Sequence, residues 1–122
     1  MRRLEVMQWL GLLLGAAVWG VAHIAGYGAT EASCNSAGPV FTIDMHQWEG
    51  VVNGVTAVLA LAAGLSATAI VVRTRGVSYE DAPPLGRIRF FAIAALIANL
   101  LFLVMIVLYA AGSIANTPCV QS

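Results

Sequence analysis

Charged residues are scarce in this sequence. Only 10% of the 122 residues are charged, whereas 60% are hydrophobic and the mean hydropathy is +0.85. A soluble domain carries about 25% charged residues, and a chain this short has no single water-soluble core that could bury so much apolar surface. The composition therefore excludes an ordinary soluble domain and predicts a protein whose main solvent is the lipid bilayer.

The sequence also lacks basic runs and catalytic motifs. The formal net charge is zero and the basic residues are dispersed, so we expect no nucleic-acid partner. No H-E-x-x-H, C-x-x-C or nucleotide-binding glycine pattern is present, and no Ser-His-Asp set lies on one predicted side of the membrane. We therefore expect that the chain is not an enzyme by itself.

Long apolar runs are what the sequence does contain. Three segments, residues 7–27, 51–72 and 90–112, contain no Asp, Glu, Lys or Arg. Each has about 20 residues, the length that a helix needs to cross the hydrocarbon of a bilayer. Backbone groups in lipid must form hydrogen bonds within their own segment, which favours helices over an open set of strands. The first segment is long for a signal peptide and no small-x-small cleavage site follows, so we expect it to be retained.

These segments predict an all-α membrane protein with one domain over residues 1–122. Asp44 stands where an N-cap would stand, so the second helix is expected to begin at Met45. The three transmembrane helices are predicted at about 7–27, 45–73 and 87–112.

The placement of the arginines predicts the orientation. All six basic residues are arginines, and they fall before the first span or within and directly beside residues 74–86. Short cytoplasmic loops carry an excess of basic residues. We therefore predict a cytoplasmic N-terminus and cytoplasmic loop 74–86, with the loop 28–44 and the C-terminal tail 113–122 outside.

The two cysteines fall on the predicted outer side. Cys34 lies in the outer loop and Cys119 in the outer tail, where oxidising conditions allow a disulfide. Two cysteines permit one intrachain bridge, and we predict it. A metal site is not predicted, because two thiols alone do not complete a tetrahedral shell.

Polar side chains within or beside the spans are the usual place to look for function. His23 lies in the last turn of the first span and His46 in the first turn of the second, and Asn99 lies near the middle of the third. Three further polar residues follow His46 on one helical stripe: Glu49, Asn53 and Thr56.

Three interpretations of these residues are open. In the first, His23 and His46 are axial ligands of a b-type haem. In the second, His23 or Glu49 accepts the proton of a quinol whose ring is flanked by aromatic residues. In the third, which we favour, no cofactor is bound and the polar residues, Glu49, Asn53 and Asn99 among them, contact other helices or a partner subunit. The candidate flanking aromatics of the second interpretation are Trp19, Tyr27 and Trp48.

Small residues at helical spacing support the third interpretation. Gly11 and Gly15 form a G-x-x-x-G pattern in the first span, which lets helices approach closely. Similar stripes occur in the other two spans, and we expect three large residues of the third span to face lipid or a neighbouring chain. The stripes are Ala60, Gly64, Thr68 and Ala92, Ala95, Asn99, and the large residues are Phe102, Met105 and Tyr109.

Some of these features recur together in one family. The first span reads Leu12-Leu13-Leu14-Gly15, followed by Trp19, His23 and Tyr27; the third begins Arg87-Ile88-Arg89-Phe90 and later reads Leu101-Phe102; the tail has Pro118-Cys119, with Cys34 in the outer loop. In these respects the chain resembles the small three-helix membrane proteins encoded beside haem–copper cytochrome c oxidase subunits in bacteria. The resemblance implies an accessory subunit or assembly partner of a respiratory oxidase in the bacterial plasma membrane. It does not imply that the chain itself binds redox cofactors.

Overall fold

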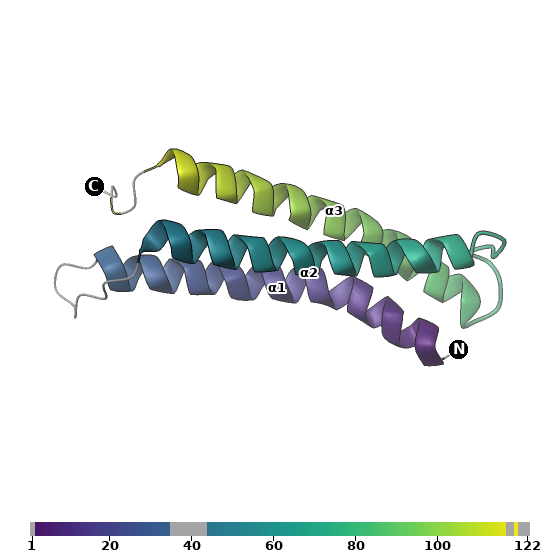
Figure 1. Cartoon of the computed structure of the whole chain (residues 1–122). Coiled ribbons are helices and arrows are strands. Elements are labelled where there is room, and N and C mark those ends of the chain that lie inside the picture. Colours follow the sequence, from purple (N-terminus) through teal and green to yellow (C-terminus); the bar gives the residue numbers. More distant parts are fainter. Residues whose placement is uncertain (1, 35–43, 117–118, 120–122) are drawn as a thin grey trace.

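Three long helices make up the described part of the chain. The computed structural model describes residues 2–34, 44–116 and 119. The helices lie side by side in an elongated bundle and alternate in direction, so the start of α1 and the end of α3 lie at opposite ends (Figure 1). Each helix is long and apolar enough to cross a membrane, which indicates a multi-pass membrane protein. The helices are α1 (Arg2–Cys34), α2 (Met45–Arg73) and α3 (Leu85–Ala115).

Two of the helices extend beyond the apolar segments that predicted them. Residues 28–34 continue α1 as a helix, although the sequence analysis placed them in the outer loop, and α3 runs on to Ala115. The reason is that hydropathy marks where the hydrocarbon ends, not where backbone hydrogen bonding ends. The remainder of the predicted loop, 35–43, and tail residues 117–118 and 120–122 lie outside the described residues.

Asp44 starts α2 as its N-cap. Its carboxylate accepts hydrogen bonds from the backbone N–H groups of His46 and Gln47, at 3.1 and 3.3 Å. These bonds satisfy two of the donors that every helix leaves free in its first turn. The helix ends at Arg73, where the backbone N–H of Thr74 donates to the carbonyl of Ile70.

The connection between α2 and α3 is tied to both helices. The guanidinium of Arg89 donates to the carbonyl of Thr74 and lies 5.6 Å from the centre of the Tyr79 ring. At Gly86 a Cβ atom would meet the carbonyl oxygens of Asp81 and Tyr79 at 2.7 and 2.8 Å. The absence of a side chain at Gly86 therefore lets the loop backbone lie directly on the first turn of α3.

Small residues bring the helices together in the half of the bundle that contains the arginines. Ile70 and Ile88 are fully buried there. Gly11 faces Ala67, and a Cβ atom at Gly11 would lie 3.5 Å from the Ala67 Cβ atom, which is ordinary contact. The other buried small residues of this half are Ala63, Ala92 and Ala95. The predicted stripe of α2 was therefore partly wrong, because Ala63 and Ala67 are buried whereas Thr68 is exposed.

Aromatic side chains occupy the space between α1 and α3 in the other half. The rings of Trp19 and Phe102 lie 5.8 Å apart, and those of His23 and Tyr109 lie 6.2 Å apart. Figure 1 shows α3 diverging from the other helices toward its C-terminal end, as larger spacers require. The expectation that Phe102 and Tyr109 face lipid or a partner holds only in part: both contact α1 and Phe102 is half-buried, but Tyr109 is still 41% exposed. Met105 is 43% exposed.

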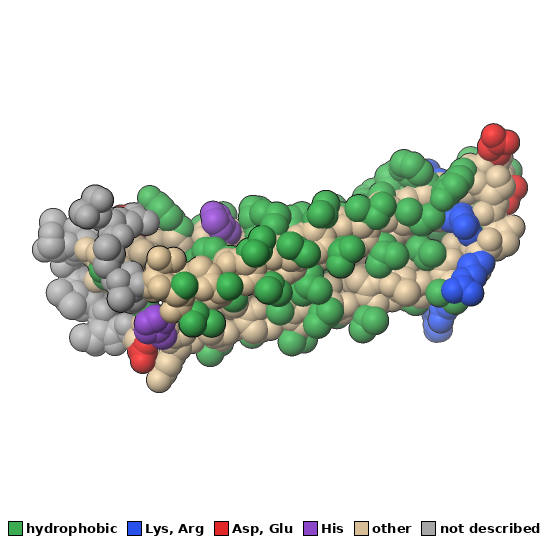
Figure 2. Space-filling view, turned by 90° about the horizontal axis from the view of Figure 1, so that it is seen from above, with side chains coloured by type: hydrophobic (Ala, Val, Ile, Leu, Met, Phe, Trp, Pro, Cys, Tyr) green, Lys and Arg blue, Asp and Glu red, His purple; other side chains and the backbone are tan. Residues whose placement is uncertain are grey.

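Charge is confined to the ends of the bundle. Figure 2 shows the arginines at one end and a broad apolar surface between the ends. Many large apolar side chains along all three helices are exposed, as on a surface that faces lipid or other membrane helices. The basic residues are Arg2 and Arg3 on α1, Arg73 and Arg75 at the end of α2, and Arg87 and Arg89 at the start of α3.

Candidate functional site

Asn99 joins all three helices near the middle of the bundle. Its side chain is 3% exposed. The amide nitrogen donates to the carbonyl of Gly11 on α1 at 2.6 Å and to the carbonyl of Ala95 on α3 at 2.8 Å. On α2, a Cβ atom at Gly64 would lie 3.8 Å from the Asn99 Cβ atom. The side chain therefore fixes the register of α1 against α3.

The Asn99 side chain packs against the backbone of Gly15. A Cβ atom at Gly15 would overlap the Oδ1 atom of Asn99 and lie 3.1 Å from its Cγ atom. The Oδ1 atom is buried and has no hydrogen-bond partner. It lies against the backbone of Gly15, where a weak Cα–H contact is the interaction open to it. Of the two glycines in the G-x-x-x-G pattern, Gly15 is the one that the packing requires.

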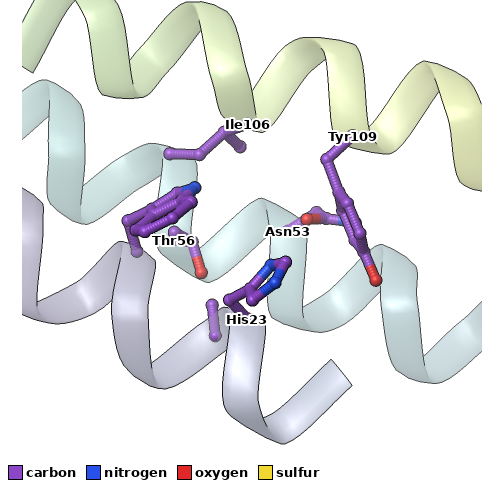
Figure 3. A pocket seen from close by; sticks show the side chains of 7 residues that line it. His23, Asn53, Thr56, Ile106 and Tyr109 are labelled. Carbon is purple, nitrogen blue, oxygen red and sulfur yellow. The ribbon is translucent and has the colours of Figure 1, made fainter. Parts of the chain in front are cut away.

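A second polar site lies between the helices nearer their other end. Seven residues from α1, α2 and α3 line a cavity of about 20 Å³ that is open on one side, because His23 is exposed and Tyr109 is 41% exposed. Figure 3 shows His23 on α1, Asn53 and Thr56 on α2, and Ile106 and Tyr109 on α3 around one space. The complete lining is Trp19, Ala22, His23, Asn53, Thr56, Ile106 and Tyr109.

Aromatic contacts hold His23 at this cavity. Its ring stacks on Trp19, one helical turn away, with the ring centres 5.4 Å apart. The edge of its ring meets Tyr109 on α3. A Cβ atom at Gly26 would lie 3.1 Å from the Tyr109 hydroxyl oxygen, so the phenol also rests on the α1 backbone.

The volume of the cavity limits what it can hold. A water molecule needs about 10–15 Å³ of such space, whereas a cavity that binds benzene measures about 150 Å³. At about 20 Å³ the cavity accommodates a water-sized molecule. A quinone ring or a haem does not fit inside this volume.

The structure divides the polar stripe that the sequence predicted on α2. Asn53 and Thr56 line the cavity, whereas His46 is exposed and Glu49 is half-buried, and neither lines it. His23 and His46 are therefore not brought together around this space. Over residues 2–34, 44–116 and 119, no group of three or more His, Cys, Asp or Glu side chains could hold a metal ion.

The sequence analysis missed Ile106 and Tyr109. The signal was present, because Asn99, Phe102, Ile106 and Tyr109 follow one another at spacings of three or four residues on one helical stripe. Extending the stripe beyond Asn99 would have turned these larger residues toward the other helices.

A disulfide closes the end of the bundle where α3 diverges. Cys34, the last residue of α1, is bonded to Cys119, which follows α3, and their Cα atoms lie 5.2 Å apart. This is the bridge that the sequence predicted. It links positions 85 residues apart in the sequence and holds α1 and α3 on either side of the cavity.

An apolar groove runs along the other side of α1, between α1 and α2. Its volume is about 480 Å³, and Ala22 and Thr56 separate it from the polar cavity. Small residues from α1 and valines from α2 form most of its wall, and Trp48 lies at one end. The lining is Ala17, Val18, Val21, Ala22, Ala25, Trp48, Val51, Val52, Val55, Thr56 and Leu59.

Comparison with known proteins assigns no family to the chain. No protein-family model matches the sequence, and neither a curated protein nor a solved structure is significantly similar to it.

Proposed function

We propose that this protein is a non-catalytic subunit of a bacterial respiratory membrane complex. The observation that supports a subunit role most directly is the apolar groove between α1 and α2. Small residues at Ala17, Ala22 and Ala25 would let a transmembrane helix of another subunit approach the backbone of α1 closely. In this proposal the groove receives such a helix.

The respiratory part of the proposal depends on the family resemblance. The residues that carry it include Trp19, His23 and the Arg87–Phe90 stretch, and the partner it implies is a haem–copper terminal oxidase or its supercomplex. We place the arginine end of the bundle in the cytoplasm and the disulfide end outside the bacterial plasma membrane. The support for this orientation is the distribution of the six arginines.

Purification of the tagged chain from its native membrane in mild detergent tests this proposal. We expect subunits of an oxidase or quinol dehydrogenase to co-purify. Recovery of the chain alone would contradict the subunit role, and recovery with an unrelated membrane complex would contradict only the respiratory part.

A bulky substitution in the groove sharpens the experiment. Val55→Trp fills the groove and is expected to remove most of the co-purifying protein, because the approaching helix can no longer reach α1. Leu108→Trp is the matched control, since Leu108 is comparably exposed on α3 but lies outside the groove. Equal retention of partners by both variants would contradict the groove as the contact. Formation of the disulfide in both variants checks that they fold.

An electron-transfer protein that binds haem b or a quinone through His23 and His46 is the alternative function. The geometry favours it less, because the cavity at His23 accommodates only a water-sized molecule and His46 does not line it. A b-type band in the dithionite-reduced visible spectrum of the purified chain would support a haem.

A further inference from the structure

The cavity beside His23 gathers hydrogen-bonding groups from three different helices. His23 comes from α1, Asn53 and Thr56 from α2, and Tyr109 from α3. The other lining residues are Trp19, Ala22 and Ile106. We propose that this cavity is a binding site for one ordered water molecule that bridges the three helices.

The donors and acceptors around the cavity suit a water molecule. The Thr56 hydroxyl donates its proton to the carbonyl of Val52 at 2.6 Å, so its oxygen can only accept from the cavity side. The Asn53 amide and the Tyr109 hydroxyl can each donate and accept, and a neutral imidazole at His23 has one donor and one acceptor nitrogen. A water molecule both donates and accepts, and it needs two to four such partners.

The size and position of the site favour a single bound molecule. A volume of about 20 Å³ is sufficient for one water molecule. The cavity lies just inside the ends of the apolar segments, where polar groups left without partners would be costly. A bridging water satisfies them at little loss compared with direct hydrogen bonds.

The proposed water links the helices in this half of the bundle, as direct contacts between small residues do in the half that contains the arginines. Near the arginines the helices contact one another directly, and Asn99 joins α1 to α3. Around the cavity Trp19, Phe102 and Tyr109 keep α1 and α3 further apart, so a direct bond like that of Asn99 is replaced by one through water. The site is a hydration site that belongs to the fold and does not depend on the proposed respiratory role.

Water-contact nuclear magnetic resonance on the full, disulfide-bonded chain in lipid bilayers tests the proposal. With asparagine labelled by nitrogen-15, the chain gives four side-chain amide signals, and Asn53→Asp and Asn99→Asp identify two of them. Asn99 is the buried reference, because it is 3% exposed and surrounded by helix contacts, whereas Asn53 is half-buried. Exposed Asn116 reports contact with bulk water. The four residues are Asn35, Asn53, Asn99 and Asn116.

We expect magnetisation transfer from water to Asn53 to be several-fold stronger than to Asn99. A soluble paramagnetic chelate should then remove the Asn116 signal and leave that of Asn53. Transfer to Asn53 no stronger than to Asn99 would overturn the water site. Loss of the Asn53 signal together with that of Asn116 would also overturn it, because bulk water would then reach the cavity.

Discussion

Gly15 and Asn99 set the distance between α1 and α3. The Asn99 amide bonds the Gly11 carbonyl, and its Oδ1 atom rests on Gly15 without a hydrogen-bond partner. An interhelical hydrogen bond within a membrane contributes about 0.6 kcal/mol on average, so the bond itself is a modest part of the stability. The larger consequence is geometric, because a side chain at Gly15 would occupy the space of Oδ1.

Substitution of the two glycines of the G-x-x-x-G pattern should therefore have unequal effects. Gly15→Ala is expected to lower the free energy of unfolding by about 1–3 kcal/mol, the usual cost of overpacking. Gly11→Ala is the matched control and should have little effect, because its Cβ atom would be in ordinary contact with Ala67. Reversible unfolding in mixed micelles, followed by circular dichroism, measures both.

A double substitution isolates the cause. In an Asn99→Ala background, Gly15→Ala should lose most of its cost, because the overlapping oxygen is gone. The two substitutions would then show a coupling of about 0.5–3 kcal/mol. Additive effects would mean that Gly15 contacts something other than Asn99.

At the scale of the helices, the sequence predicted the number and chemical character of the elements well. Apolar runs without charge identify spans because lipid tolerates few alternatives. Asp44 was correctly predicted to cap α2, since capping depends on residues adjacent in the sequence. The last two turns of α1 were not predictable from hydropathy. Residues 28–34 are small or polar, yet they are helical.

The sites were harder to predict because they depend on which faces of different helices meet. Nothing local to Gly11 and Gly15 distinguishes them, and only the position of Asn99 on another helix does. Likewise Asn53 and Thr56 were recognised as one stripe, but the contact of Tyr109 with His23 was not predicted, because the two residues lie 86 positions apart in the sequence (109 minus 23). The sequence therefore identified the polar residues of the site but not the residues of other helices that contact them.

Reduction of the disulfide should loosen one half of the bundle selectively. The Cys34–Cys119 bond links α1 to the C-terminal end of α3. In this half, aromatic side chains and the small cavity lie between the two helices in place of close contacts. Reduction is expected to speed amide hydrogen exchange in residues 102–115 of α3 and to leave residues 86–95 protected by their small buried neighbours. Exchange followed by mass spectrometry in lipid nanodiscs measures both segments.

The double variant Cys34→Ala with Cys119→Ala serves as the control for the reducing agent and should reproduce the pattern. Equal acceleration of hydrogen exchange along all of α3 would contradict a bundle in which one half is held by close packing and the other by the disulfide. A loop of this length contributes about 4.6 kcal/mol in the chain-entropy model. This contribution is smaller if the helices remain in the membrane when the bond is open, because the chain then gains less conformational freedom.

The whole molecule has two chemically different ends. All six arginines gather at one end, and the polar cavity and the disulfide lie toward the other. The apolar surface between them includes the groove proposed for a partner helix. This asymmetry relates the fold to the proposed role, because a subunit inserted in one orientation presents the same groove and the same tied end to its complex.

Cysteine labelling in intact cells tests the three-span topology most directly. In the Cys34→Ala, Cys119→Ala background, Tyr79→Cys places a thiol on the loop between α2 and α3, and Asn116→Cys places one after α3; both positions are exposed. A membrane-impermeant maleimide should label position 116 in intact cells and position 79 only after lysis. Labelling of position 79 in intact cells, with or without position 116, would contradict three crossings with the arginine end in the cytoplasm.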